Sequence, residues 1–151
     1  MFDGMLEQPA IGIVLLWHEN VVAVTTYRQS NQEMHVMVKL TTTNTPWLFS
    51  IIYARTNLIH RSFLWDNLCT LKSHYSGPWL MCGNFNQVMS QNKNWGGRPI
   101  NYTRANKFLT CMNFHWDLID LGFKVSTYMW SNHRKKDGLI LGRLDANRSW
   151  I

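Results

Sequence analysis

Two asparagines follow the end of an apolar run in the segment WLMCGNFNQVM (residues 79–89). The run stops at Gly83, and Asn84 and Asn86 come next, on either side of Phe85. A side-chain amide donates and accepts hydrogen bonds, but unlike a carboxylate it cannot exchange a proton. The same two residues could simply cap the exit of a strand through bonds to the local backbone. That role is one of binding, without acid–base chemistry.

Other polar side chains also lie where predicted strands or turns end, and loops at strand ends are where a scaffold presents functional groups. Tyr53 could face a ligand or be an ordinary rim tyrosine. Asp145 could act in a site or form only a weak surface ion pair with Arg143. A basic turn after the segment YMWSN could contact nucleic acid or be a solvated charge run. The candidates beside the two asparagines are therefore Tyr53, Asp145, Asn132, Arg98, Arg134 and Lys135.

The first third of the chain is patterned as strands. Short β-branched and aromatic runs separated by polar turns predict strands at residues 11–18, 21–27, 34–40 and 47–54. Their short connections favour a four-stranded antiparallel meander. Within it, residues 34–40 alternate and should have one wet face, whereas residues 47–54 are apolar on both faces and should lie centrally.

Elements that could cover this sheet follow. Leu64, Leu68 and Leu71 have the spacing of one helical face and predict a helix over residues 58–75, ended by Gly77 and a proline. A short buried strand follows at residues 79–82, where Gly83 lets the chain turn sharply. A second helix is predicted after an N-cap at Thr103, and short strands at 126–132 and 139–145. This order predicts an α+β domain with helices on sheet faces.

Composition and charge narrow the class of protein. The chain has 151 residues, 46% of them apolar, which fits one folded domain. The net charge of +6 comes from residues 91–151, which hold ten Lys or Arg and four Asp or Glu, whereas residues 1–90 hold five of each. This aromatic, basic part is compatible with a polyanionic partner, and an ordinary basic surface explains the charge equally well.

Cysteines and hydropathy bear on location. Cys69, Cys82 and Cys111 lack C-x-x-C spacing and lie in apolar stretches, which favours buried free thiols in a reducing compartment. The longest apolar run is too short to cross a bilayer, and the N-terminus lacks the features of a secretory signal. We therefore expect a soluble, intracellular protein without a membrane partner. The histidines have no ligand spacing, so none is predicted to bind a metal.

Seven segments of the chain are informative when they are read together and in order. They are LLWHEN, IIYARTNLIHRSFLWDNL, PWLMCGNFNQV, GGRP, FLTCMNFHWDLIDLGF, YMWSN and GLILGRLD. In this order they resemble the endonuclease/exonuclease/phosphatase superfamily of DNase I-like phosphodiesterases. More narrowly, they resemble the endonuclease domain of plant LINE-type (non-LTR) retrotransposons. The resemblance covers residues 12–150 and implies a four-layer αββα sandwich, here a partial one in a single incomplete domain over residues 1–151.

The resemblance also implies roles for individual residues. Asn86 matches the asparagine of the family's GDFN motif, which hydrogen-bonds the scissile phosphate, and Tyr53 matches a tyrosine that faces the same phosphate. Asp145 matches an aspartate that orients a catalytic histidine, and Asn132 lies near the substrate loops. The family uses Mg²⁺ and acts on DNA. In an intact element, a reverse transcriptase domain could be a further partner.

Departures from the family pattern count against catalysis. Asn84 stands where GDFN has an aspartate implicated in proton transfer, so this position can only make hydrogen bonds. The metal-binding glutamate is expected upstream of Gly12, where Glu7 is no convincing match. The family's terminal S-D-H is expected downstream of Ile151. We therefore expect no intact metal site and no histidine partner for Asp145.

Three functions remain as hypotheses. We favour a degenerate retrotransposon-derived endonuclease domain, ancestrally a Mg²⁺-dependent DNA phosphodiesterase, that no longer catalyses cleavage. The first alternative is an active Mg²⁺-dependent endonuclease or phosphodiesterase whose missing segments are supplied from elsewhere. The second is a non-catalytic nucleic-acid-binding module, which salt-dependent DNA binding without cleavage would single out.

Overall fold

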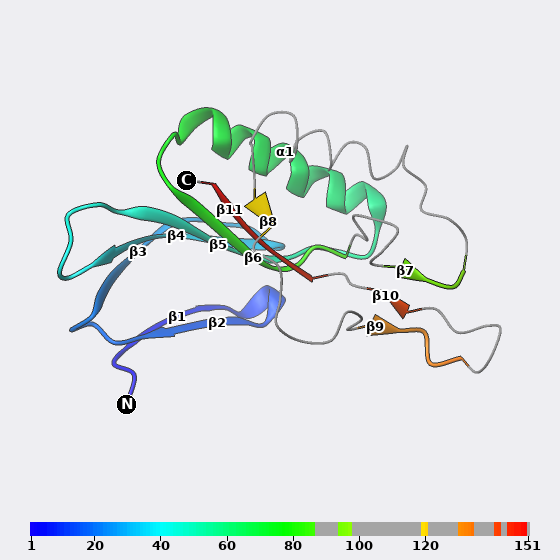
Figure 1. Cartoon of the computed structure of the whole chain (residues 1–151), viewed down its shortest axis with the longest axis horizontal. Helices are drawn as coiled ribbons and strands as arrows, with labels where there is room; N and C mark the ends of the chain where they lie inside the picture. The colour runs from blue at the N-terminus through cyan, green and yellow to red at the C-terminus, as the bar shows by residue number, and fades with distance from the viewer. Residues whose placement is uncertain (87–93, 98–118, 121–129, 135–140, 143–144, 151) are drawn as a thin grey trace.

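The computed structural model describes residues 1–86, 94–97, 119–120, 130–134, 141–142 and 145–150. Within them the strands form sheets of two, three and six strands, and one α-helix is present (Figure 1). The elements are β1 (Gly4–Gln8), η1 (Pro9–Ile11), β2 (Ile13–Trp17), β3 (Val22–Gln29), β4 (Glu33–Leu40), β5 (Trp47–Tyr53), α1 (Leu58–His74), β6 (Trp79–Asn84), β7 (Asn94–Trp95), β8 (Ile119–Asp120), β9 (Trp130–Ser131), β10 (Leu141–Gly142) and β11 (Asp145–Trp150).

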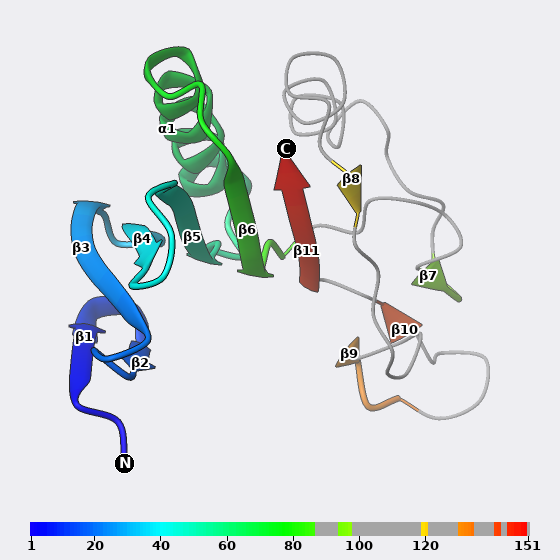
Figure 2. The ribbon, with the colours of Figure 1, turned by 60° about the vertical axis from the view of Figure 1, so that its left-hand side comes forward.

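The six-stranded sheet has the order β3-β4-β5-β6-β11-β8. Its first three strands form an antiparallel meander, and α1 then carries the chain back so that β6 pairs parallel to β5. Strand β11 pairs antiparallel to β6, which encloses β5 and β6 on both sides (Figure 2). The predicted central position of residues 47–54 is therefore confirmed.

Strand β2 does not belong to the meander, so the predicted four-stranded arrangement is wrong. It pairs instead with β1, a strand that the sequence did not predict. The turn η1 and Gly12, whose φ is +65°, reverse the chain between the two strands. At the other end of the hairpin, a Cβ atom on Gly4 would overlap the indole of Trp17, so only glycine permits this approach.

Three layers are visible in Figure 1, with α1 on one face of the six-stranded sheet and the β1–β2 hairpin on the other. Two apolar clusters fill the spaces between them. Under α1 lie buried side chains of the helix, β5 and β6, among them Leu64, Leu68 and Trp79. Under the hairpin, Ile13 packs with Met34, Val36 and Val38 of β4. This layering agrees with the predicted α+β class, while the second predicted helix lies outside the described residues.

Helix α1 forms where the periodicity predicted it. The side chain of Asn57 accepts hydrogen bonds from the backbone N–H groups of Ile59 and His60, which caps the first turn. The predicted stripe is buried against the sheet. Two apolar residues next to that stripe, Ile59 and Phe63, are instead 68% and 60% exposed. The outer surface of the first turns is therefore partly apolar.

Strand β4 is buried on both faces at its start, and the prediction of one wet face is wrong there. Glu33 and His35 face α1 and are fully buried. Asn67 of α1 donates to Glu33 Oε1 at 3.0 Å, and Glu33 Oε2 lies 3.4 Å from His35 Nε2. His35 Nδ1 is 2.6 Å from Ser50 Oγ, which also accepts a bond from Trp79 Nε1 at 2.7 Å. Burial is tolerated because this chain of contacts partners most of the polar atoms.

Strand β3 is the last strand at its end of the described sheet. The register of its pairing with β4 shifts between Thr26 and Arg28, which makes Tyr27 a bulge. The Tyr27 ring lies edge to face with that of Tyr75, with centroids 6.5 Å apart. The bulge therefore lies in contact with the C-cap residue of α1.

The described cysteines, Cys69 and Cys82, are half-buried, which is less burial than the sequence suggested. Burial raises the pKa of the Cys82 thiol. No helix among the described residues is long and apolar enough to cross a membrane.

Candidate functional site

Strand register brings three of the predicted site residues into one row. Tyr53 at the end of β5 pairs with Asn84 at the end of β6, and Asn84 pairs with Asp145 at the start of β11. Neighbouring strands are about 4.8 Å apart, so the row spans about 10 Å. Residues directly opposite each other share a face, and Tyr53 alternates with Ile52, which is buried under α1. The row therefore lies on the sheet face away from α1.

The row lies at the ends of the central strands, next to the three-stranded sheet β7-β10-β9. Figure 1 shows the start of β11 beside β10. Tyr53 is 51% exposed and Asn84 is half-buried, so solvent reaches this edge. For Asp145, the backbone pairing gives its place in the row. A phosphate group could therefore approach the row from solvent.

Gly83 has a different role from the predicted sharp turn. Strand β6 continues through Gly83 to Asn84, two residues beyond the predicted end. Gly83 has a φ of +129°, and a Cβ atom there would overlap the carbonyl oxygen of Ile52 on β5. Glycine at this position thus lets the two central strands approach each other immediately before Asn84. The pairing of these two segments continues one residue beyond β5, where the Ala54 N–H donates to the backbone oxygen of Asn84 at 2.8 Å.

Both amides of the GNFN segment are hydrogen-bonded to backbone groups, one within the segment and one to the residue after β5. Asn84 Oδ1 accepts a hydrogen bond from the backbone N–H of Asn86 at 2.7 Å, and Asn86 Nδ2 donates to Ala54 O at 2.5 Å. Asn86 adopts a φ of +48°, a conformation that asparagine tolerates better than most residues. Phe85 between them is fully buried and stacks on Trp65. The predicted bond to the local backbone is therefore present for Asn84, whereas Asn86 bonds to Ala54 after β5. Among the described residues, no partner is found for Asn84 Nδ2 or for the second N–H of Asn86 Nδ2.

A buried arginine that the sequence did not single out joins the loops around the site. Arg61 Nη1 donates to Asn86 O at 2.5 Å, and it lies 3.4 Å and 3.5 Å from the carbonyl oxygens of Thr56 and Arg55. Burial lowers the pKa of Arg61, although a guanidinium stays charged in proteins. The sequence held a signal for this role, because Arg61 precedes Leu64 on the inner face of the helix, where a buried arginine needs polar partners.

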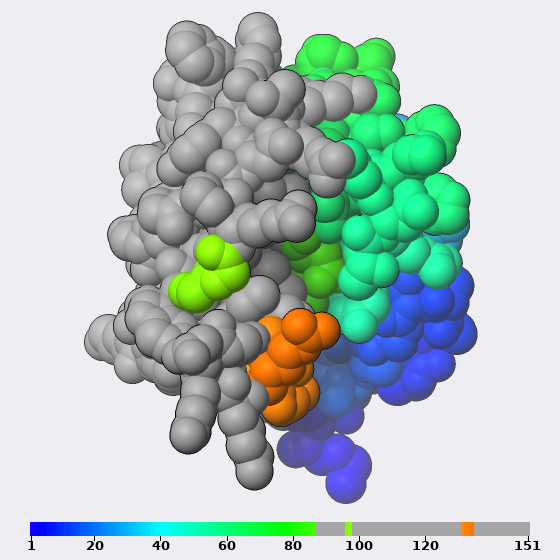
Figure 3. Space-filling view, turned by 90° about the vertical axis from the view of Figure 1, so that its right-hand side faces the viewer, coloured from blue at the N-terminus to red at the C-terminus, as the bar shows by residue number. Residues whose placement is uncertain are grey.

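Two of the remaining candidates, Asn132 and Arg134, lie just after a strand of another sheet. Asn132 and Arg134 follow β9, where Asn132 Oδ1 accepts a bond from the Arg134 N–H at 3.2 Å. The next bond of the turn joins the His133 N–H to Ser131 Oγ. Arg134 is exposed, and Figure 3 shows segment 131–134 (orange) on the same face of the molecule as the first turns of α1 (blue-green). Arg98 and Lys135 lie outside the described residues.

The two amides of the GNFN segment do not by themselves make a Mg²⁺ site. Magnesium is bound in proteins chiefly through carboxylate oxygens, and Asn84 offers an amide whose oxygen already accepts the Asn86 N–H. The carboxylate of Glu33 is buried on the opposite face of the sheet. Over the part of the chain that the structure describes, no three His, Cys, Asp or Glu residues are grouped so that they could hold a metal ion. We therefore assign no step to a metal.

Solved structures with the same architecture identify the fold. The endonuclease domain of TRAS1, a telomere-specific non-LTR retrotransposon, superposes with a TM-score of 0.65 at 13% identity, over 89% of this chain and 57% of that one. An endonuclease/exonuclease/phosphatase family protein from Bacteroides thetaiotaomicron gives 0.53 at 10% identity, over 91% and 53%. The fold is that of the DNase I-like superfamily. The predicted partial α+β sandwich is thus confirmed.

The catalytic domain of human Nocturnin, solved with a bound sulfate anion, shares the DNase I-like fold at a TM-score of 0.53 and 14% identity, over 92% of this chain and 52% of that one. The chain thus spans little more than half the length of these structures. No protein-family model and no curated protein matches the sequence. At such identities the likeness establishes the fold, and the plant LINE-type assignment stays a prediction.

Proposed function

We propose that the chain is a DNase I-like domain of retrotransposon origin that binds nucleic acid and does not hydrolyse it. The observation that carries the proposal is Asn84 at the centre of the row formed with Tyr53 and Asp145. The resemblance places an aspartate there. An amide keeps the hydrogen bond that shapes the loop, because its oxygen accepts the Asn86 N–H, but it offers no exchangeable proton.

Phosphodiester hydrolysis makes three demands on a site. A water must lose a proton, negative charge on the phosphate must be stabilised, and the leaving oxygen must gain a proton. The N–H groups of Asn84 and Asn86 and the hydroxyl of Tyr53 can meet the second demand by hydrogen bonding. The two amides cannot meet the first and third, because neither exchanges a proton. The Mg²⁺ that the resemblance implies would need carboxylates that the described part of the row does not group together.

Nucleic acid is the partner that this reasoning favours. The TRAS1 domain is an endonuclease, and TDP2 from D. rerio, solved in complex with single strand DNA product, shares the fold at a TM-score of 0.52 and 9% identity. In this chain the hydrogen-bond donors of the row are open to solvent at one end of the central strands. The exposed Arg134, which follows β9, adds positive charge to the three-stranded sheet next to the row. A reverse transcriptase domain as a further partner follows only from the retrotransposon resemblance.

Nicking of supercoiled plasmid in the presence of Mg²⁺ tests the proposal. We expect no nicking by the chain or by Asn84→Asp, because one restored carboxylate does not rebuild a metal site. Asn44→Asp, an exposed asparagine in the β4–β5 connection, is the matched control for the added charge. Binding of a labelled DNA fragment, measured by fluorescence anisotropy, should weaken as salt is raised.

Two results would contradict the proposal separately. Metal-dependent nicking that Asn86→Ala abolishes would establish the active nuclease as the correct alternative. Failure to bind DNA at low salt would remove nucleic acid as the partner.

A further inference from the structure

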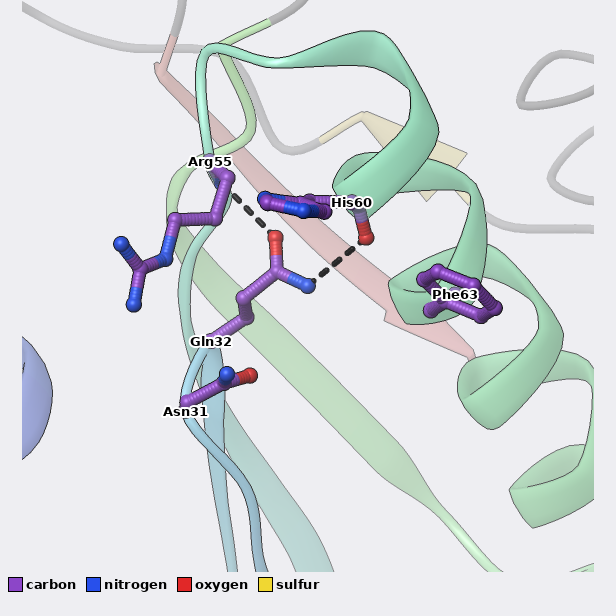
Figure 4. Close-up of a pocket in the computed structure, with 5 residues that line it drawn as sticks. All are labelled: Asn31, Gln32, Arg55, His60 and Phe63. Atoms are coloured by element: carbon purple, nitrogen blue, oxygen red, sulfur yellow. Dashed lines mark hydrogen bonds between the residues drawn. The ribbon is translucent and has the colours of Figure 1, made fainter.

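A pocket of about 370 Å³ lies at the same end of the sheet as the row (Figure 4). It forms where the β3–β4 turn, the end of β5 and the first turns of α1 meet. Its size is within the range of small-ligand sites, roughly 300–1,000 Å³. The residues that line it are Asn31, Gln32, Arg55, His60 and Phe63.

The buried side chain of Gln32 forms the floor of the pocket. Gln32 Nε2 donates to His60 O at 2.9 Å, and Gln32 Oε1 accepts from the Arg55 N–H at 2.8 Å (Figure 4). The backbone carbonyl of Gln32 accepts from the Tyr53 N–H at 2.8 Å. One residue therefore fixes both walls of the pocket and connects its floor to the row. The pocket is preformed and adjoins the candidate site.

The lining combines a cation with an exposed ring. Arg55 and Phe63 are exposed, and none of the described residues that line the pocket is acidic. Within the described part of the chain, no side-chain hydrogen bond or ion pair holds the Arg55 guanidinium. In Figure 4 that guanidinium and the Phe63 ring lie on opposite sides of Gln32, with the His60 ring above it. A complementary ligand carries negative charge at one end and a planar group at the other.

The anion would be held by side chains, because the helix terminus is already occupied. The N–H groups of Ile59 and His60 donate to the Asn57 side chain and are not free for a phosphate. Phosphate recognition is a common use of arginine, whose planar guanidinium presents several donors at once. An exposed aromatic ring offers a stacking face to a base, and every base has one.

We propose that this pocket binds one unpaired nucleotide of a nucleic-acid strand, with its phosphate at Arg55 and its base against Phe63. The proposal rests on the proposed function and extends it by naming single-stranded nucleic acid as the ligand. Stacking requires a base whose face is free, and a base within a duplex does not offer one. Since Gln32 adjoins Tyr53, the bound strand would continue from the pocket to the row.

The test is binding of a short fluorescein-labelled oligothymidylate, followed by anisotropy over a range of salt concentrations. Phe63→Ala should weaken binding about tenfold, and Phe63→Tyr should restore it, because stacking needs the ring. Arg55→Ala should reduce the magnitude of the salt slope by about 0.7, the contribution of one phosphate contact to a single strand. Ile59→Ala, on the same helical turn, and Lys39→Ala, an exposed cation of β4, are matched controls outside the lining and should change neither quantity.

The outcomes separate this inference from the proposed function. Strand binding that neither Phe63→Ala nor Arg55→Ala alters would overturn the pocket as the site and leave nucleic-acid binding intact. The pocket would also be overturned as the site if Phe63→Ala lowered the affinity for a duplex of the same sequence as much as it lowered the affinity for the single strand. Equal occupancy by free thymidine monophosphate would instead show a mononucleotide site and contradict the claim of a strand. Binding of the duplex without binding of the strand would overturn the pocket alone, whereas binding of neither would overturn both ideas.

Discussion

Gly83→Ala should destabilise the protein far more than Gly12→Ala, although both glycines have positive φ. The two positions differ in space. A Cβ atom on Gly83 would overlap the backbone oxygen of Ile52 on the neighbouring strand, whereas nothing lies within 4 Å of one on Gly12. Backbone on both sides of Gly83 belongs to the paired central strands and cannot move independently. The pair of variants therefore separates backbone strain from steric overlap.

The expected magnitudes follow from these two terms. At Gly12 the left-handed conformation costs alanine about 1–2 kcal/mol, of which the stiffer unfolded chain returns about 0.4–1 kcal/mol. At Gly83 alanine would impose a similar strain. It would also push β5 and β6 apart, so that ladder hydrogen bonds worth about 1 kcal/mol each, and the packing around them, are lost. The total at Gly83 is about 3–5 kcal/mol. For a chain of this size, each kcal/mol lowers the melting temperature by about 2–4 °C.

Urea unfolding followed by tryptophan fluorescence measures both variants, since the chain has eight tryptophans. The midpoint should shift only slightly for Gly12→Ala, while Gly83→Ala should lose most of its stability or its cooperative transition. Similar midpoints for the two variants would refute the reasoning, because they would mean that β5 and β6 can separate at no cost.

Two further predictions concern a buried cation and a thiol. Arg61→Met keeps the length of the side chain but removes the bonds to three loop carbonyls, so it should lower the free energy of unfolding by about 1–3 kcal/mol in the same urea assay, and an unchanged midpoint would contradict the bridging role. Burial raises the pKa of Cys82, so the folded state holds the thiol proton more tightly than the unfolded state. The free energy of unfolding should therefore fall as pH rises past the ordinary thiol range. Alkylation of Cys82, followed by mass spectrometry, should require a higher pH in the folded chain than in urea.

Local sequence patterns predicted two kinds of element: a helix that is buried on one face, and a strand that is apolar along its whole length. The leucine spacing defined α1, and the continuous apolar run defined β5 as central. Strand β1 escaped prediction because its pairing with β2 depends on the turn at Pro9 and on contact with Trp17. Strand β11 escaped because the polar run DANRSW becomes a strand through its register with β6. Neither partner is visible in the local sequence.

For the candidate site, the sequence predicted which residues stand at strand ends but not their order across the sheet. That order comes from the register of three strands, two of them parallel through α1 and one antiparallel. The double role of Asn84, as a cap and as a member of the row, was also left open, and the structure supports the cap directly. Arg61 and Gln32 were missed because each acts through backbone carbonyls or N–H groups, which sequence patterns do not record.

The bulge at Tyr27 has a consequence for how copies of the protein meet. Among the described strands, β3 has a neighbour on one side only, so its free N–H and C=O groups could template the addition of a strand from another molecule. The shifted register interrupts that template midway, and the charged Arg28 follows at once. Concentrated solutions should accordingly resist edge-to-edge aggregation for as long as this irregularity is kept.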